Sequence, residues 1–423
     1  MSELGWILSL GRLGALICGV PIAFALGGVA LVGFLVAGID PLVVARRLIA
    51  GTQTLSLLAI PGFILAGEIM RLGGLTRRLI RIASALVGHI SGGLSMATVV
   101  AATFFGAISG SAPATTAAVG TIMPDELEKR GYRRAYAAAL CTSVGPLGQM
   151  IPPSIPMIIW GVLAEESIAR LFLAGLLPGL LTSAGFLVVS WLYGRVRGVP
   201  REERATLHEL IAALRSGIWA LLSPVIILGG IYGGVFTPTE ASMVAVVYGL
   251  LVGVGIYREL GWKELGQVLT GSLRTTANVT FVIAMAAPFA WLMSYERIPV
   301  TVAESLLSLS SNPIIILLIL NIMLLVIGAL MDTIAAMIIL SGVLTTVGQQ
   351  LGMPNASRGA CCHQLRHRHG HVAGRLLAVR RNERHRSPHG ADHNQSVPLI
   401  LFIVMALVTY VPTIIVGFPN LIM

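Results

Sequence analysis

Two short polar stretches, residues 110–116 and 145–154, interrupt hydrophobic runs that are each long enough to cross a bilayer. Both contain glycine and proline, which disfavour a helix interior by about 1 and 3 kcal/mol, so neither stretch can continue as a regular helix. Broken backbone at membrane depth must be buried in protein or line a polar cavity. Hydroxyl groups and unwound carbonyls there could coordinate a hard cation such as sodium, or contact a substrate. The candidate binding residues are Gly110, Ser111, Ala112, Pro113, Thr115, Gly145, Pro152, Pro153 and Ser154.

A third interruption lies in the second half of the chain and repeats the pattern of the first. Gly328, Asp332 and Thr333 separate a long apolar run from another aliphatic helix. A carboxylate at membrane depth is costly, so Asp332 is a candidate ligand, with capping of the following helix as its alternative role. Likewise, the small residues of the first stretch could serve close helix packing. Paired interruptions in two halves favour a transporter site, and we predict one at each.

The elements that position these residues must be membrane-spanning helices. Of the 423 residues, 55% are hydrophobic and only 11% are charged, whereas a soluble domain has roughly 25% charged residues. We therefore predict an all-α polytopic membrane protein. Its start, up to Gly28, is expected to be a retained first span rather than a cleaved signal peptide. No catalytic triad, nucleotide loop or cofactor motif stands out, so we expect neither an enzyme nor an organic cofactor.

Charged residues divide the chain into two parts. Arginine and glutamate crowd residues 195–215, which we predict to link an N-terminal half, residues 1–194, to a C-terminal half, residues 216–423. Another basic connection, placed in the cytoplasm by the positive-inside rule, contains Arg71, Arg77, Arg78 and Arg81. The formal net charge is +10, but the block 357–396 alone supplies +6. We therefore expect the lipid bilayer, and no nucleic acid, as a partner.

In these features the chain resembles the large membrane subunit of a tripartite ATP-independent periplasmic (TRAP) transporter. The resemblance covers about residues 1–353 and 397–423, and it is specific because five strings match in the same order. The strings lie at residues 109–115, 151–156, 171–179, 237–241 and 328–332.

The resemblance implies an inverted-repeat, elevator-type transporter with two re-entrant or broken-helix regions, located in the bacterial inner (cytoplasmic) membrane. It implies a sodium gradient as the driving force, with Na⁺ as coupling ion and no other cofactor. A soluble periplasmic binding protein would deliver an organic acid, a C4-dicarboxylate or another carboxylate, and a small membrane subunit would complete the complex. By motif position, Ser111 and the break at 145–154 would build one sodium site. Asp332 and its surroundings would contribute to the symmetry-related one.

Residues 357–396 depart from the family. A second broken helix is expected after Gly352-Met353, but this block holds eight arginines and seven of the nine histidines. Each arginine in hydrocarbon would cost about 2.5–3.5 kcal/mol. The block could be a zinc-binding tract with Cys361 and Cys362, although its spacing matches no defined zinc site. It could also be a basic cytoplasmic loop.

A shifted reading frame is the third interpretation of this block. Permitted codons for residues 363–375, read from the second base, can encode Ile-Asn-Phe-Ala-Ile-Gly-Met-Val-Thr-Ser-Pro-Val-Gly. That is a hydrophobic segment with a polar break, close to the string that the family has there. We therefore hypothesise two compensating frame slips, near 354–358 and near 395–397. For the chain as written, we expect little or no coupled transport, because its second site would lack the broken helix.

Three alternative functions fit parts of the sequence. A stand-alone ion-coupled dicarboxylate carrier would need no binding protein. A membrane metal-binding protein would take up stoichiometric zinc through the Cys/His block. A scaffold-like subunit would respond to Ser111→Ala or Asp332→Asn only in its assembly.

Overall fold

A computed structural model of the protein describes residues 3–310, 312–330 and 333–351. These residues form helices joined by short connections, and none of them lies in a strand. The prediction of an all-α membrane protein is confirmed. Asp332 and the block 357–396 lie outside the described residues.

The helices of the N-terminal half are α1 (Glu3–Ile17), α2 (Ile22–Val36), α3 (Leu42–Ala50), η1 (Leu55–Leu58), α4 (Ala59–Leu72), α5 (Leu75–Val87), α6 (Gly93–Ser109), α7 (Ala112–Gly120), α8 (Met123–Lys129), α9 (Arg134–Ser143), α10 (Leu147–Met150), α11 (Ile155–Leu163) and α12 (Ile168–Arg197). Those of the C-terminal half are α13 (Leu207–Tyr232), α14 (Pro238–Leu250), η2 (Leu251–Ile256), α15 (Trp262–Tyr295), α16 (Ile298–Ser308), α17 (Pro313–Leu330) and α18 (Thr333–Gln350). Irregular backbone at 198–206 therefore lies within the predicted link 195–215.

Six helical segments in the described part of the chain are long and apolar enough to cross a membrane. They are Leu55–Leu72, Ile168–Arg197, Leu207–Tyr232, Pro238–Ile256, Trp262–Tyr295 and Thr333–Gln350. Shorter apolar helices, including α2, α6, α16 and most of α17, pack among them.

Local sequence signals explain where several helices begin. At the start of α14, Thr237 and Glu240 form a capping box, in which the N–H of Thr237 donates to Glu240 Oε2 over 2.8 Å. Thr206 and Glu209 repeat this arrangement at the start of α13. Each pair satisfies N–H groups that have no partner within the helix. Glu240 therefore serves as a capping residue.

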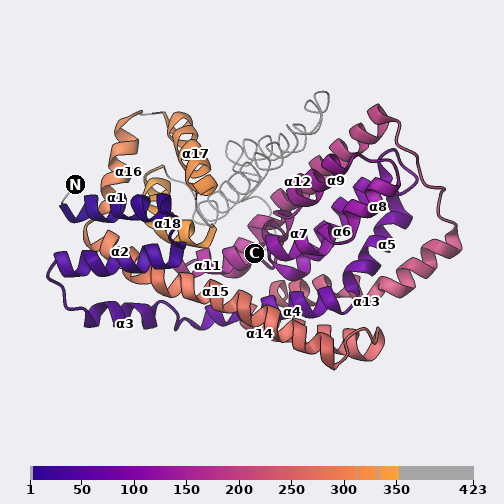
Figure 1. Ribbon diagram of the computed structural model, residues 1–423, viewed down its shortest axis with the longest axis horizontal. Helices are drawn as coiled ribbons and strands as arrows, with labels where there is room; N and C mark the ends of the chain where they lie inside the picture. The colour runs from indigo at the N-terminus through magenta and orange to yellow at the C-terminus, as the bar shows by residue number, and fades with distance from the viewer. Residues whose placement is uncertain (1–2, 311, 331–332, 352–423) are drawn as a thin grey trace.

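Helices from the two halves pack directly against one another. Helix α14 packs on α4, α13 packs on α5, and α15 packs on both α2 and α4. Figure 1 shows α5 to α9 and α12 gathered at one end of the molecule, and α1 to α3 with α16 and α17 at the other. Helix α11 lies between these groups and contacts α18.

Candidate functional site

The first helix break lies between α6 and α7, where the sequence predicts it. Gly110 ends α6 in the left-handed conformation, with φ at +61°. Ser111 is extended, and its Oγ accepts a 3.4 Å hydrogen bond from the N–H of Ala114, which caps α7. Glycine adopts positive φ at no steric cost, and a capping serine satisfies a free N–H of the new helix. These two residues therefore convert one long apolar run into two helices.

The second break separates α10 from α11. Pro152 and Pro153 are joined by a cis peptide bond, and Ser154 is the extended residue before α11. The hydroxyl of Ser154 donates to the carbonyl oxygen of Gln149 over 2.6 Å, which folds the segment back on the end of α10. All three residues are buried.

The structure brings the two breaks together. The N–H of Ile155 donates to the carbonyl oxygen of Gly110 over 3.2 Å. A Cβ on Gly110 would lie 2.7 Å from the carbonyl oxygen of Pro153, so the two backbones touch. A Cβ on Gly145 or Gly148 would overlap the hydroxyl of Thr116 or Thr115, respectively. The two stretches thus pack into one unit. Gly110, Thr115, Gly145 and residues 152–154 are buried in it, whereas Ser111 and Ala112 are partly exposed and Pro113 is exposed.

Hydroxyl groups line this unit, and not all of them were identified from the sequence. Thr115 is fully buried, and its Oγ1 lies 3.1 Å from Ser109 Oγ on the other side of the break. Ser143, also fully buried at the end of α9, has an Oγ with no hydrogen-bond partner among the described residues. The candidate residues chosen from the sequence did not include Ser109. Its signal was its position at the start of the string 109–115 that resembles the family.

The electrostatics of this unit come from the backbone. Residues 109–116 and 143–155 contain no ionisable side chain. Helices α7 and α11 begin here, and helix N-termini carry partial positive charge that favours anions. Helix α6 ends here, and its C-terminal carbonyls favour cations. The arrangement can therefore accommodate an anionic group and a cation side by side without a fixed charge.

The third interruption is described only in part. Gly328, near the end of α17, and Thr333, the first residue of α18, are both buried. Asp332 lies outside the described residues, so its predicted role is not tested. Helix α18, which begins at the third interruption, packs against α11, which begins at the second break.

The zinc hypothesis rests on Cys361, Cys362 and the histidine-rich block, which also lie outside the described residues. Within the part of the chain that the structure describes, no group of three or more His, Cys, Asp or Glu side chains is placed to hold a metal ion.

An all-α bundle of apolar helices that buries two facing helix breaks is the architecture of a membrane transporter. A profile of the family described as "Tripartite ATP-independent periplasmic transporter, DctM component" matches residues 11–373. The chain belongs to this family, and the resemblance inferred from its five strings is confirmed. It is accordingly a transporter permease of the bacterial inner membrane and not an enzyme.

Curated relatives support this assignment. The C4-dicarboxylate TRAP transporter large permease protein DctM of Pseudomonas aeruginosa is 39% identical over 381 residues, which cover 89% of each chain. The isethionate TRAP transporter permease protein DctMQ of Oleidesulfovibrio alaskensis is 40% identical over 340 residues. That match covers 80% of this chain, but the chain spans only about half, 54%, of this relative.

A solved transporter shares the fold. The YdaH transporter of Alcanivorax borkumensis superposes with a TM-score of 0.51 at 13% identity. The superposition covers 90% of this chain and 86% of that one. At this identity the likeness supports the fold alone.

Proposed function

We propose that the protein is the membrane permease subunit of a binding-protein-dependent secondary transporter that imports an organic acid together with sodium ions. A soluble periplasmic protein captures the substrate and delivers it to this chain. A small membrane subunit completes the assembly. The family name, which denotes a tripartite periplasmic transporter, supports both partners.

The observation that carries this proposal is the contact between the two helix breaks. The hydrogen bond from Ile155 to Gly110 holds the start of α11 against the end of α6. This bond pairs one N–H of α11 with the carbonyl of Gly110. We assign the carboxylate to the other N–H groups at the starts of α7 and α11, and sodium to the other carbonyls at the end of α6 together with nearby hydroxyls. The hydroxyls of Ser109, Ser111 and Thr115 supply neutral oxygens at this point.

Sodium coupling makes uptake respond to the membrane potential. The potential assists import when the sodium ions carry more positive charge into the cell than the substrate carries negative charge. The membrane potential contributes about 2.3 kcal/mol per charge per 100 mV. Each additional sodium ion that accompanies the substrate increases this driving force.

The proposed substrate class is an organic anion, with a carboxylate as our first choice. Relatives of nearly equal identity are named for a C4-dicarboxylate and for isethionate. Sequence identity therefore does not select one of them. The N-termini of α7 and α11 recognise negative charge in general.

The proposed transport cycle uses the internal repeat. Helices α6 and α7 are separated by a break, and in the second half α17 ends at Leu330 and α18 begins at Thr333. We propose that these two pairs belong to an inverted repeat, which supports alternating access by movement of one unit against the other around a fixed site. We propose an elevator-type movement for this chain.

Sodium binding is tested first with Ser111→Ala, measured as sodium-dependent thermal stabilisation of the purified full chain. Ligand that binds only the folded state raises its stability in proportion to RT ln(1 + [L]/Kd). Ser167→Ala is the matched control, because Ser167 caps α12 with the same 3.4 Å bond but lies outside the site. We expect Ser111→Ala to lose most of the sodium-dependent shift and Ser167→Ala to keep it. Equal shifts in both variants would contradict the sodium site.

Transport itself is tested in proteoliposomes with the binding protein and the small subunit. Two versions of the chain are compared, the sequence as written and one with residues 357–396 returned to the alternative frame. We expect sodium-dependent uptake only from the second. Uptake without a binding protein would instead support the stand-alone carrier.

A further inference from the structure

The first half of α15 differs from an ordinary membrane-spanning helix. The helix has 34 residues, so it is about 51 Å long at 1.5 Å per residue, whereas about 20 residues suffice to span a bilayer. Residues 279–295 are predominantly apolar. Residues 262–278 carry most of the helix's polar side chains, and this segment has three distinct faces.

One face of the segment packs on the protein, and a second is apolar and open. Val268 and Ser272 are buried, with Val268 packed against Ile69 and Leu260. About a third of a turn around the helix, Trp262, Leu269 and Leu273 are 92%, 52% and 66% exposed.

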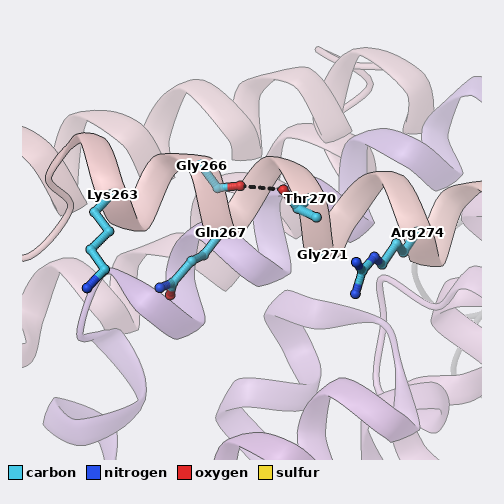
Figure 2. A pocket seen from close by; sticks show the side chains of 6 residues that line it. All are labelled: Lys263, Gly266, Gln267, Thr270, Gly271 and Arg274. Atoms are coloured by element: carbon cyan, nitrogen blue, oxygen red, sulfur yellow. Dashed lines mark hydrogen bonds between the residues drawn. The ribbon is translucent and has the colours of Figure 1, made fainter.

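The third face is polar and carries a shallow groove of about 530 Å³ that is open on its outer side. Its lining residues all belong to α15 and are Lys263, Gly266, Gln267, Thr270, Gly271 and Arg274. Figure 2 shows the side chains of Lys263, Gln267 and Arg274 leaving the helix on the same side. Thr270 donates its hydroxyl hydrogen to the carbonyl oxygen of Gly266 over 2.8 Å, so it lies close along the helix. The two glycines leave room above the backbone.

The groove carries uncompensated positive charge. Neither Lys263 nor Arg274 forms an ion pair with any described residue. The Glu68 carboxylate lies at the edge of the groove, where its Oε2 would be 3.7 Å from a Cβ on Gly271. Glu68 is already paired with Arg71 over 2.7 Å. The Glu264 carboxylate accepts a hydrogen bond from the N–H of Gly261.

An apolar open face beside a basic open face is the pattern of a helix that lies in the membrane interface. Exposed tryptophan is enriched at the same depth. If the segment stood upright in hydrocarbon, Arg274 would lie about 16 Å beyond Lys263 and cost about 2.5–3.5 kcal/mol. An interfacial position removes that cost, because both cations then lie among the headgroups.

We propose that residues 262–278 lie in the membrane interface and that the groove from Lys263 to Arg274 binds the phosphate headgroup of an anionic phospholipid. The apolar face of Trp262, Leu269 and Leu273 enters the acyl region beside that lipid. The groove begins close to the basic connection after α4, since Leu260 contacts Gly73 and Glu259 pairs with Arg78. That connection is predicted to be cytoplasmic, and the cytoplasmic leaflet is the one with the negative surface potential.

The full chain, purified and delipidated in detergent, is titrated with phosphatidylglycerol or phosphatidylcholine, and bound lipids are counted by native mass spectrometry. We expect preferential binding of phosphatidylglycerol. In the double variant Lys263→Gln/Arg274→Gln, the affinity should fall by roughly tenfold or more, because each basic residue near an anionic surface contributes about 1 kcal/mol. The control Arg77→Gln/Arg81→Gln removes the same charge from exposed, unpaired positions on α5 and should change little.

Gly266→Leu provides a test that leaves the charge unchanged. A Cβ on Gly266 meets no atom within 4 Å, so the leucine fits the fold and fills the groove. We expect it to reduce phosphatidylglycerol binding as the double variant does. Equal binding of both lipids, equal loss in the Arg77/Arg81 control, or displacement by millimolar inorganic phosphate would overturn the proposal. The proposal would also be overturned if an acidic membrane helix added to the purified chain abolished the binding of phosphatidylglycerol, because that helix would then occupy the groove in place of lipid.

Discussion

The N–H of Ile155 donates a hydrogen bond to the carbonyl oxygen of Gly110 over 3.2 Å. The bond joins the first residue of α11 to the residue that ends α6, so two breaks that are distant in sequence share backbone partners. Broken backbone inside a membrane protein needs such partners, because lipid supplies none. The two breaks consequently act as one structural unit, and a change in either should disturb the other.

Gly110→Ala tests this unit through the backbone. At φ +61° an alanine costs about 1–2 kcal/mol, and its Cβ would lie 2.7 Å from the carbonyl oxygen of Pro153. We expect the free energy of unfolding to fall by about 1–3 kcal/mol, measured by thermal unfolding in detergent. Gly120→Ala is the control, because Gly120 ends α7 without positive φ and its Cβ would meet no atom within 4 Å. It should be neutral or slightly stabilising.

Thr115→Val tests whether the buried hydroxyl pair contributes to sodium binding. The substitution preserves shape but removes the Oγ1 that lies 3.1 Å from Ser109 Oγ. A polar contact to a charge is worth about 1.5–3 kcal/mol, so apparent sodium affinity should fall roughly tenfold or more. Sodium-dependent thermal shifts measure this, and Thr121→Val is the control because its hydroxyl bonds only Ala117 within the exposed end of α7. Unchanged sodium affinity in Thr115→Val would exclude Thr115 as a ligand.

The helix breaks were predictable from the sequence, because glycine, proline and capping serine act locally. Gly110, Ser111, Pro152 and Pro153 each restrict the backbone by their own chemistry. The contact between Gly110 and Ile155 was not predictable in the same way. The contact depends on how helices far apart in the chain pack. It joins two backbone groups, so the side-chain types of Gly110 and Ile155 do not indicate it.

Helix α15 shows a second limit of sequence reasoning. No charged residue occurs between Arg274 and Glu296, so composition alone would begin a membrane span at Thr275, whereas the helix begins at Trp262. The charges of Lys263 and Arg274 conceal the first part of the helix. In the structure, Lys263 and Arg274 lie on one face of the continuous helix α15. The two charges therefore indicate a change in the surroundings of the helix and not its end.

Arg78→Met tests the contact between the two halves of the chain. The guanidinium of Arg78 donates to the carbonyl oxygen of Gly74 over 3.0 Å and pairs with Glu259. It also lies 3.6 Å from the ring centroid of Tyr257. We expect a loss of about 1–3 kcal/mol in unfolding free energy, because the partly buried Glu259 loses its partner.

The control for this contact is Arg77→Met. Arg77 is the preceding residue on α5, is exposed, and forms no ion pair with the described residues. Its replacement should leave thermal unfolding in detergent unchanged. If both substitutions destabilise the protein equally, the effect comes from charge on α5 and not from the bond between the halves.

The block at 357–396 leads to a prediction about the gene. The family match ends at residue 373, inside this block. Resequencing codons 350–400 from genomic DNA should show two compensating insertions or deletions that restore an apolar segment with an Asn…Thr-Ser-Pro-like break. The physical reason is that eight arginines cannot occupy hydrocarbon, where the family resemblance leads us to expect a second broken helix.

The opposite sequencing result has an equally definite consequence. If the basic block is confirmed, the chain keeps the proposed first site between α6 and α11 but lacks the second break on which the proposed two-site mechanism depends. Sodium should then still stabilise the protein through Ser111 and Thr115, whereas coupled uptake should be absent. Stoichiometric zinc that is lost on replacing the histidines of 357–396 by alanine would show that the block binds metal instead. Coupled uptake by the chain as written would contradict the requirement for a second broken helix.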